Sequence, residues 1–343
     1  MQGARLQLRN LADLEDLLTR PSNEDIQAAR NLGGDVLILG AAGKIGPSLA
    51  VRIKRAIQQV GLSHRVIGVV RKDRGVFAGH ADGIDVIESD LLNAGAYRGL
   101  PDAPNVVFMV GRKFGSTGDQ PLTWATNVWV AGLAADRFRD SRIIAFSTGN
   151  IYPFMPVDGP GARETTPPAP TGEYAQSALG RERIFEYFSN VYGTRVLIYR
   201  LNYAVDLRYG VLVDIGQQVL KGEPIDVETG HANVIWQGDA NSYCLRAFDL
   251  SGSPARILNV TGQKTISVRE MAQRFGRRFG KEPRIVGQES ATALLSDASD
   301  CIETLGPPTI DEDDLFEMTA EWLDRGGETL GKPTKFESRD GQF

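Results

Sequence analysis

A buried apolar run that breaks into three evenly spaced glycines constrains this chain more than any other feature. Residues 35–46 read DVLILGAAGKIG, with glycines at Gly40, Gly43 and Gly46. This order predicts a strand, a tight turn and the start of a helix, because glycine permits a sharp exit from the strand and a close approach of the backbone to a ligand. Backbone amides at a helix N-terminus bind anions, so the turn predicts a site for the diphosphate of a dinucleotide.

Strand and helix patterns alternate along the segment that follows. The apolar runs expected as buried strands are 36–39, 65–70, 84–87, 106–110, 142–146 and 194–199. Helical patterns at 47–60, 124–139 and 174–191 lie between them. This alternation predicts an α/β fold, a Rossmann-like doubly wound parallel sheet whose ligands bind at the carboxyl ends of the strands.

The remaining sequence divides the chain into three expected parts. Residues 1–33 carry leucine-rich helical patterns and are expected to form a helical extension. The dinucleotide-binding domain is expected over 34–206. Residues 207–343 mix short strand signals with helices and predict a smaller substrate-binding lobe, from which the chain returns to the first domain around 230–262.

Composition argues against several classes of protein. The chain has 343 residues, 42% of them hydrophobic, and a formal charge of -5, so it reads as a soluble globular protein without a basic block for nucleic acid. We find no membrane-spanning apolar stretch and no signal-peptide pattern, and therefore expect a cytoplasmic protein. Cys244 and Cys301 fit structural thiols in a reducing compartment. His64, His80 and His231 lack metal-ligand spacing, so no metal site is expected.

Several further motifs make the chain resemble the extended short-chain dehydrogenase/reductase family, the group of nucleotide-sugar epimerases and dehydratases. The resemblance covers roughly residues 34–325 and rests on the glycine turn, on FSTGNIYP at 146–153, on Tyr174 and on LNVTGQKTISVREMAQ at 258–273. The motif RLNY at 200–203 departs from the family, because its asparagine comes one residue early.

The resemblance implies a nicotinamide cofactor along the carboxyl edge of the sheet. The residues that it places against the cofactor are Gly40, Gly43, Lys44, Ile45, Gly46, Arg71, Asp90, Leu91, Gly111, Arg112, Asn127, Ser147, Tyr174 and Asn202. The second strand ends without an acid to bind the adenosine ribose hydroxyls, whereas Arg71 is suited to hold a 2′-phosphate. We therefore expect NADP rather than NAD, although Asp73 lies close by.

In this family a tyrosine donates or accepts a proton while hydride moves to or from the nicotinamide. Tyr174 corresponds to that tyrosine, and Thr148 to the hydroxyl that orients the substrate. The motif Tyr-Xaa-Xaa-Xaa-Lys is incomplete here, because Ala178 replaces the lysine that lowers the tyrosine pKa. Two cations are candidates for that role: Arg181, about two helical turns after Tyr174, and Lys113, which follows the fourth strand.

These residues predict an NAD(P)-dependent enzyme that acts on a hydroxyl or carbonyl carbon of a sugar, sugar acid or nucleotide sugar, by oxidoreduction or by transient oxidation as in epimerisation. The expected substrate contacts are Asn150, Asp206, Arg208, His231 and Trp236. Two alternatives stay open: a regulatory dinucleotide-binding protein that has lost hydride chemistry, and a lyase or isomerase with Lys113 as its base. A homodimer is expected through the helices that contain Trp124 and Tyr174.

Overall fold

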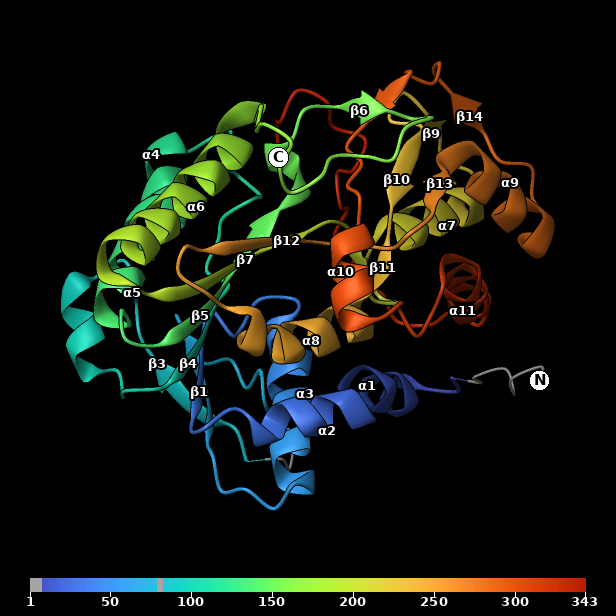
Figure 1. Ribbon diagram of the computed structural model, residues 1–343. Coiled ribbons are helices and arrows are strands. Elements are labelled where there is room, and N and C mark those ends of the chain that lie inside the picture. The colour runs from blue at the N-terminus through green and yellow to red at the C-terminus, as the bar shows by residue number, and fades with distance from the viewer. Residues whose placement is uncertain (1–7, 79–82) are drawn as a thin grey trace.

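A sheet of seven parallel strands runs through the computed structural model, which describes residues 8–78 and 83–343 (Figure 1). His80 lies outside the described residues. The strand order is β12-β7-β5-β4-β1-β2-β3, which changes direction between β1 and β4. The strands are β1 (Val36–Leu39), β2 (Val66–Val70), β3 (Asp85–Glu88), β4 (Asn105–Phe108), β5 (Arg142–Thr148), β7 (Arg195–Leu201) and β12 (Arg256–Val260). The expected doubly wound fold is confirmed.

Helices cover both faces of this sheet (Figure 1). One face carries α5 (Val130–Arg137) and α6 (Gly172–Tyr192), and the other carries α3 (Gly46–Gln59) and α8 (Gln237–Arg246). Along β1, Val36 and Ile38 are buried on the α3 side, whereas Leu37 and Leu39 are buried on the α5 side. Because side chains alternate across a strand and both faces are covered, the strands read as continuous apolar runs in the sequence.

The segment before α5 is a distorted helix. It begins as α4 (Gln120–Trp124), passes through a π-helical turn, η2 (Ala125–Trp129), and continues as α5. The helix expected over 124–139 therefore starts earlier, at Gln120, where Asp119 caps it by accepting a hydrogen bond from the Leu122 amide. π-turns of this kind occur frequently at functional sites.

The N-terminal helices pack against the same face as α3. They are α1 (Leu11–Thr19), capped by Asn10, and α2 (Asn23–Arg30), which begins with a capping box between Ser22 and Asp25. Asp25 is fully buried and accepts hydrogen bonds from Arg52 of α3 and Ser242 of α8. Such a buried, fully paired carboxylate fixes the N-terminal helices to the sheet domain.

A second lobe has its own apolar core, formed by α7 (Val211–Lys221), α9 (Val268–Phe279) and α11 (Glu312–Asp324). The other short strands are β6 (Met155–Pro156), β8 (Ala204–Val205), β9 (Ile225–Asp226), β10 (His231–Asn233), β11 (Ile235–Trp236), β13 (Thr265–Ser267), β14 (Ile285–Val286) and β15 (Thr292–Ala293). The described residues also form the helix α10 (Ser299–Leu305) and, besides the π-turn η2, three 3-10 turns. Between β11 and β12 the chain crosses back to the sheet through α8. No helix among the described residues is long and apolar enough to cross a bilayer.

Candidate active site

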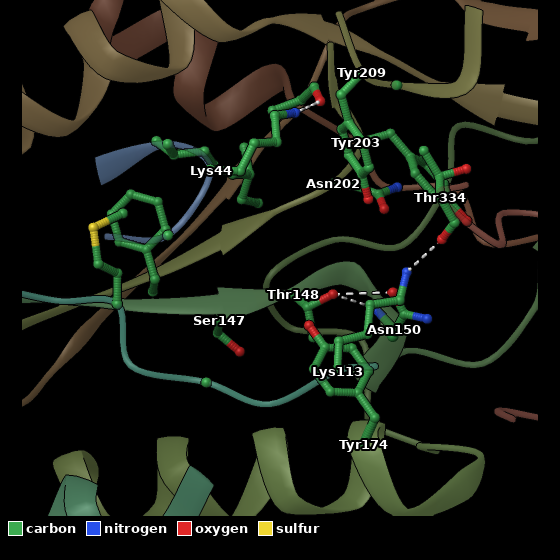
Figure 2. A pocket seen from close by; sticks show the side chains of 18 of the residues that line it. Lys44, Lys113, Ser147, Thr148, Asn150, Tyr174, Asn202, Tyr203, Tyr209 and Thr334 are labelled. Carbon is green, nitrogen blue, oxygen red and sulfur yellow. Dashed lines mark hydrogen bonds between the residues drawn. The ribbon is translucent and has the colours of Figure 1, made fainter. Parts of the chain in front are cut away.

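A cavity of about 290 Å³ lies at the carboxyl ends of β1, β4, β5 and β7, where the strand order changes direction (Figure 2). Ligands of open α/β sheets bind at this position. The residues expected from the sequence that line it are Gly40, Gly43, Lys44, Ile45, Gly111, Lys113, Ser147, Thr148, Asn150, Tyr174, Arg181 and Asn202. The structure thus brings the glycine turn and all four proposed catalytic residues to one cavity.

The glycine turn leaves the N-terminus of α3 facing this cavity. Gly40 has φ +86°, and a Cβ on Gly46 would lie 2.2 Å from the Ala41 carbonyl oxygen, so neither position accepts a side chain without rearrangement. The N-cap residue, Ile45, offers no side-chain hydrogen bond to the first turn of α3. The Gly43 and Gly46 amides donate to the Gly40 and Gly43 carbonyls, so the helix dipole is the feature of this turn that favours an anion.

Lys44 extends from the turn along the wall of the cavity. Its Nζ donates a 2.8 Å hydrogen bond to the Ala204 carbonyl and lies 4.3 Å from the centre of the Tyr209 ring. Burial lowers the pKa of Lys44 to about 8.

Thr148 and Tyr174 line the cavity from two different elements. Thr148 ends β5, and its hydroxyl pairs with the Asn150 side chain at 3.0 Å (Figure 2). Tyr174 lies in the first turn of α6, where its ring packs edge-on against Phe343 with 5.6 Å between centroids. Neighbouring Ser147 donates a hydrogen bond to Glu182, which is held by a buried ion pair with Arg200.

Arg181 is a buried cation on α6, three residues after the position of the missing lysine. Ala178 itself packs against Ile151 and Tyr152 and does not line the cavity. The Arg181 guanidinium donates to the Asn127 carbonyl and side-chain oxygens and to the Phe146 carbonyl. Burial lowers its pKa, and among the described residues no carboxylate forms an ion pair with it.

Asn127 positions this cation from the π-turn η2. Its side-chain oxygen also accepts the Arg112 amide at 2.7 Å, and its nitrogen donates to the Arg112 carbonyl and to Ser177. Asn127 is fully buried and absent from the cavity wall. It therefore acts as a positioning residue that joins the loop after β4 to α6. The Arg112 side chain points elsewhere, donating to the Gly115 carbonyl.

Lys113 approaches the cavity from the loop after β4. Its Nζ donates a 3.1 Å hydrogen bond to the Thr334 carbonyl and lies 4.3 Å from the centre of the Phe343 ring. Burial lowers the pKa of Lys113 to about 8, while the charges of Glu337 and Asp214 act in the opposite direction. Tyr174 and Lys113 thus contact the same phenyl ring.

Four of the five expected substrate contacts do not reach the cavity. Asp206 is buried in an ion pair with Arg208, which also binds Glu15 of α1, so this pair joins the second lobe to the N-terminal extension. Trp236 belongs to the core of the second lobe. His231, on β10, is partly buried with an Nδ1 that has no partner among the described residues. The described residues contain no metal-binding group of three or more His, Cys, Asp or Glu.

The cofactor residues expected near the adenine also lie outside the cavity wall. Arg71 follows β2 and is exposed, with no ion pair among the described residues. Asp90 and Leu91 follow β3, with Asp90 exposed and Leu91 buried. These positions form the part of the sheet edge beyond β1, on the β2 and β3 side.

The cavity wall also contains three residues that were not expected from the sequence: Tyr203, Tyr209 and Thr334. Tyr203 adopts φ +44°, a strained conformation for a bulky residue that often marks a functional site, and Tyr209 stands beside it (Figure 2). Thr334 comes from the far end of the chain. Of these three residues, only Tyr203 had a signal in the sequence, because it lies in the RLNY motif.

Comparison with known families decides the classification. A model described as the NAD dependent epimerase/dehydratase family matches residues 36–205. Through this segment the chain belongs to that family. The resemblance inferred from the motifs is confirmed, and the chain carries the fold of NAD-dependent enzymes of the extended short-chain dehydrogenase/reductase type.

Solved structures share this fold at low sequence identity. DesIV, a dTDP-glucose 4,6-dehydratase from Streptomyces venezuelae with NAD and TYD bound, is 18% identical, and the similarity covers 85% of this chain and 97% of that chain with a TM-score of 0.72. The UDP-glucose 4-epimerase of Thermus thermophilus, in complex with NAD, is 20% identical over 85% and 99%, with a TM-score of 0.68. MoeE5, in complex with UDP-glucose and NAD, is 19% identical over 85% and 99%, with a TM-score of 0.69. No curated protein sequence matches the chain.

Proposed function

We propose that this protein is an NAD(P)-dependent oxidoreductase or epimerase that acts on a hydroxyl- or carbonyl-bearing carbon of a sugar, sugar acid or nucleotide sugar. The observation that carries the proposal is that Tyr174 and Thr148 line one cavity with the glycine turn of a dinucleotide-binding fold. The family match and the NAD and sugar nucleotides named for the similar structures support the same reaction class.

The residues present fit a dinucleotide cofactor. The first turn of α3 has no capping side chain, and close backbone approach is enforced at Gly40 and Gly46. Gly40, Gly43, Lys44 and Ile45 would hold the diphosphate, and Ser147 and Asn202 would lie beside the nicotinamide half. When bound, the nicotinamide supplies a hydride acceptor or donor.

The protein's own side chains would then transfer the proton of the substrate hydroxyl. In the oxidation direction Tyr174 accepts the proton of the substrate hydroxyl, and Thr148 orients that hydroxyl by a hydrogen bond. A phenolate needs a nearby positive charge at neutral pH, because the ordinary pKa of tyrosine is about 10. Arg181 supplies a permanent buried charge that interacts with Tyr174, and Lys113 supplies a second one that can be titrated.

The cofactor preference that we propose is NADP, on the strength of Arg71 at the end of β2. The similar structures are named with NAD, so the preference for NADP has to be measured on this protein. Isothermal titration of NAD and NADP into the wild type and Arg71→Ser tests it. We expect the substitution to weaken NADP binding and leave NAD binding unchanged. Equal affinities of the wild type for both cofactors would contradict the preference.

The proposed reaction is tested by Tyr174→Phe. We expect cofactor binding to persist, measured by calorimetry, while turnover on a panel of sugars and sugar acids falls by roughly 100-fold or more, because the phenyl ring cannot transfer a proton. Unchanged turnover would refute the role of Tyr174. Cofactor binding without turnover of any compound by the wild type would favour the regulatory alternative.

A lyase or isomerase that uses Lys113 as its base is the second candidate. The observation in its favour is that the pKa of this lysine lies at about 8 within the cavity, which suits a general base. Lys113→Ala distinguishes the two candidates. Complete loss of turnover with cofactor binding retained would favour the lyase or isomerase, whereas reduced turnover with an altered pH profile fits the hydride-transfer enzyme.

The surface of α6 and of the helix around η2 supports the proposed homodimer. Trp129, Tyr187, Val191 and Tyr192 are each about half exposed, although apolar side chains of this size are usually buried. We propose that a second copy of the chain covers this surface.

A cytoplasmic location and the division into domains at residues 34 and 207 are proposed on composition and pattern.

A further inference from the structure

The chain's last described stretch, residues 329–343, closes the cavity on the Tyr174 side. Thr334 forms part of the cavity wall, and Phe343 is buried against both Tyr174 and Lys113. In Figure 1 this end of the chain lies between α6 and the second lobe, above the carboxyl ends of the central strands. We call residues 329–343 the closing segment.

The closing segment is attached to both lobes. On the second lobe, Asp214 of α7 accepts hydrogen bonds from the Thr334 amide and hydroxyl at 2.8 and 2.6 Å, and Arg339 donates to the Thr292 carbonyl and hydroxyl. On the sheet domain, the Gly115 amide donates to the Phe343 carbonyl. A loosely associated tail would not place so many directional hydrogen bonds across a cleft, so the segment is part of the cavity wall.

The backbone of the closing segment also runs so close to the start of α6 that no side chain fits between them. A Cβ on Gly341 would lie 2.3 Å from the Thr171 carbonyl oxygen, and one on Gly172 would lie 2.6 Å from the Gly341 oxygen. Both glycines have positive φ, +72° and +80°. The two backbones therefore meet directly at the start of the helix that carries Tyr174.

Among the described residues, the charged side chains that face the cavity are all positive. Lys44, Lys113 and Arg181 line it, and this part of its wall contains no aspartate or glutamate. Outside this wall, the carboxylates of Glu337 and Asp214 act on Lys113, and Asp214 accepts hydrogen bonds from Thr334. Lys44 belongs to the diphosphate turn, and Arg181 uses three of its five N–H groups on oxygens of Asn127 and Phe146. Lys113 donates to one described acceptor, the Thr334 carbonyl, and keeps two N–H groups for a ligand.

The cavity is also small, although one side of it is open to solvent. Its volume of about 290 Å³ falls at the lower limit of pockets for drug-sized ligands, about 300–1,000 Å³. The same space would hold the nicotinamide and its ribose, so the space left beside Tyr174 suits a single sugar unit.

We infer that the substrate is a free, compact sugar acid whose carboxylate binds Lys113 and that the closing segment excludes nucleotide-linked sugars. This inference rests on the proposed function and makes Lys113 and Phe343 specificity-determining residues. The carboxylate would replace or join the Thr334 carbonyl at Lys113 Nζ, within reach of Tyr174 across the Phe343 ring.

The test measures binding to the full-length protein by calorimetry. Saturation with NAD or NADP comes first, and the probes are then free aldonates and uronates, the matching neutral sugars, and UDP-glucuronate. We expect a free acid to bind more tightly than its neutral counterpart and UDP-glucuronate not to bind. Lys113→Met should weaken acid binding by roughly 10- to 100-fold, leaving the dinucleotide affinity unchanged, because a charged hydrogen bond is lost.

A second variant tests the closing segment. Phe343→Ala should admit UDP-glucuronate, whereas Leu330→Ala, a substitution of an exposed side chain in the same segment, should keep the selectivity of the wild type. Binding of UDP-glucuronate or of a neutral sugar to the wild type as tightly as the free acid overturns the inference. So does a failure of every acid to bind the cofactor-loaded protein. Failure to bind either dinucleotide overturns the proposed function itself, and the inference with it.

Discussion

Lys113→Met should make the cofactor-free protein more stable at neutral pH. Burial lowers the pKa of Lys113 from its ordinary 10.5 to about 8, and each pH unit corresponds to about 1.4 kcal/mol. The charged amine therefore costs about 3 kcal/mol at pH 7, which we reduce to about 2 kcal/mol because part of the side chain remains open to solvent. Losing the hydrogen bond to Thr334 offsets about 1 kcal/mol. The expected net gain is about 1 kcal/mol.

The gain should depend on pH in a specified direction. Because the native pKa is the lower one, the unfolded chain binds more protons between pH 8 and 10.5, and the wild type gains stability as pH rises through this range. The cost of the charge is fully present below pH 8 and mostly gone at pH 10. The variant should then be about 0.5 kcal/mol less stable than the wild type, because the missing hydrogen bond costs about 1 kcal/mol and the charge cost that remains in the wild type at pH 10 offsets about half of it.

Urea denaturation followed by tryptophan fluorescence at pH 7 and pH 10 measures this difference. Lys221→Met is the matched control, because it removes an exposed lysine from the last turn of α7. The difference in free energy of unfolding between Lys221→Met and the wild type should change by less than about 0.5 kcal/mol between the two pH values. If Lys113→Met differs from the wild type by the same amount at both pH values, Lys113 is not a buried cation and the charge argument for substrate binding fails.

Three other predictions follow from the geometry. In the oxidation direction, Arg181→Met should move the acidic limb of the kcat/KM pH profile to higher pH and Arg181→Lys should partly restore it; a profile unchanged in Arg181→Met would contradict electrostatic support of the phenolate. Gly46→Ala should lower the stability of the fold in urea denaturation, while Gly43→Ala, whose Cβ would lie 3.4 Å from its nearest protein neighbour, should keep the stability of the wild type; equal stability of the two variants would refute the turn geometry. Trp129→Glu should shift the protein from dimer to monomer in sedimentation velocity, and a monomeric wild type would exclude the proposed interface.

The elements that were predicted correctly have strong local signals. The strand of Val36 to Leu39 is apolar on both faces, and the following turn requires glycine, so both are visible in a short window of sequence. Helix α8 was not predicted. Its residues Gln237, Asn241 and Ser242 are buried and hydrogen-bonded to Ser48 or Asp25, so the helix lacks the amphipathic pattern on which recognition depends.

The candidate site divides in the same way. Thr148 and Tyr174 were identified through the resemblance to the family motifs. Arg181 was identified from its spacing of two helical turns after Tyr174, and Lys113 because it follows the fourth strand at the carboxyl edge of the sheet. Asp206 and Arg208 were expected at the substrate, but their ion pairing with the N-terminal extension is a long-range contact that no local pattern reports.

The amino-acid sequence by itself determined the sheet and the glycine turn, because each depends on residues that are neighbours along the chain, and it singled out Thr148 and Tyr174 as the proposed proton-transfer pair. Only the tertiary structure decided what encloses them. Thr334 and Phe343 lie more than a hundred residues from Tyr174 in the sequence, and only their packing between the two lobes gives the cavity its size. Shape and charge of this kind arise from contacts between distant segments, which the spacing of residues does not encode.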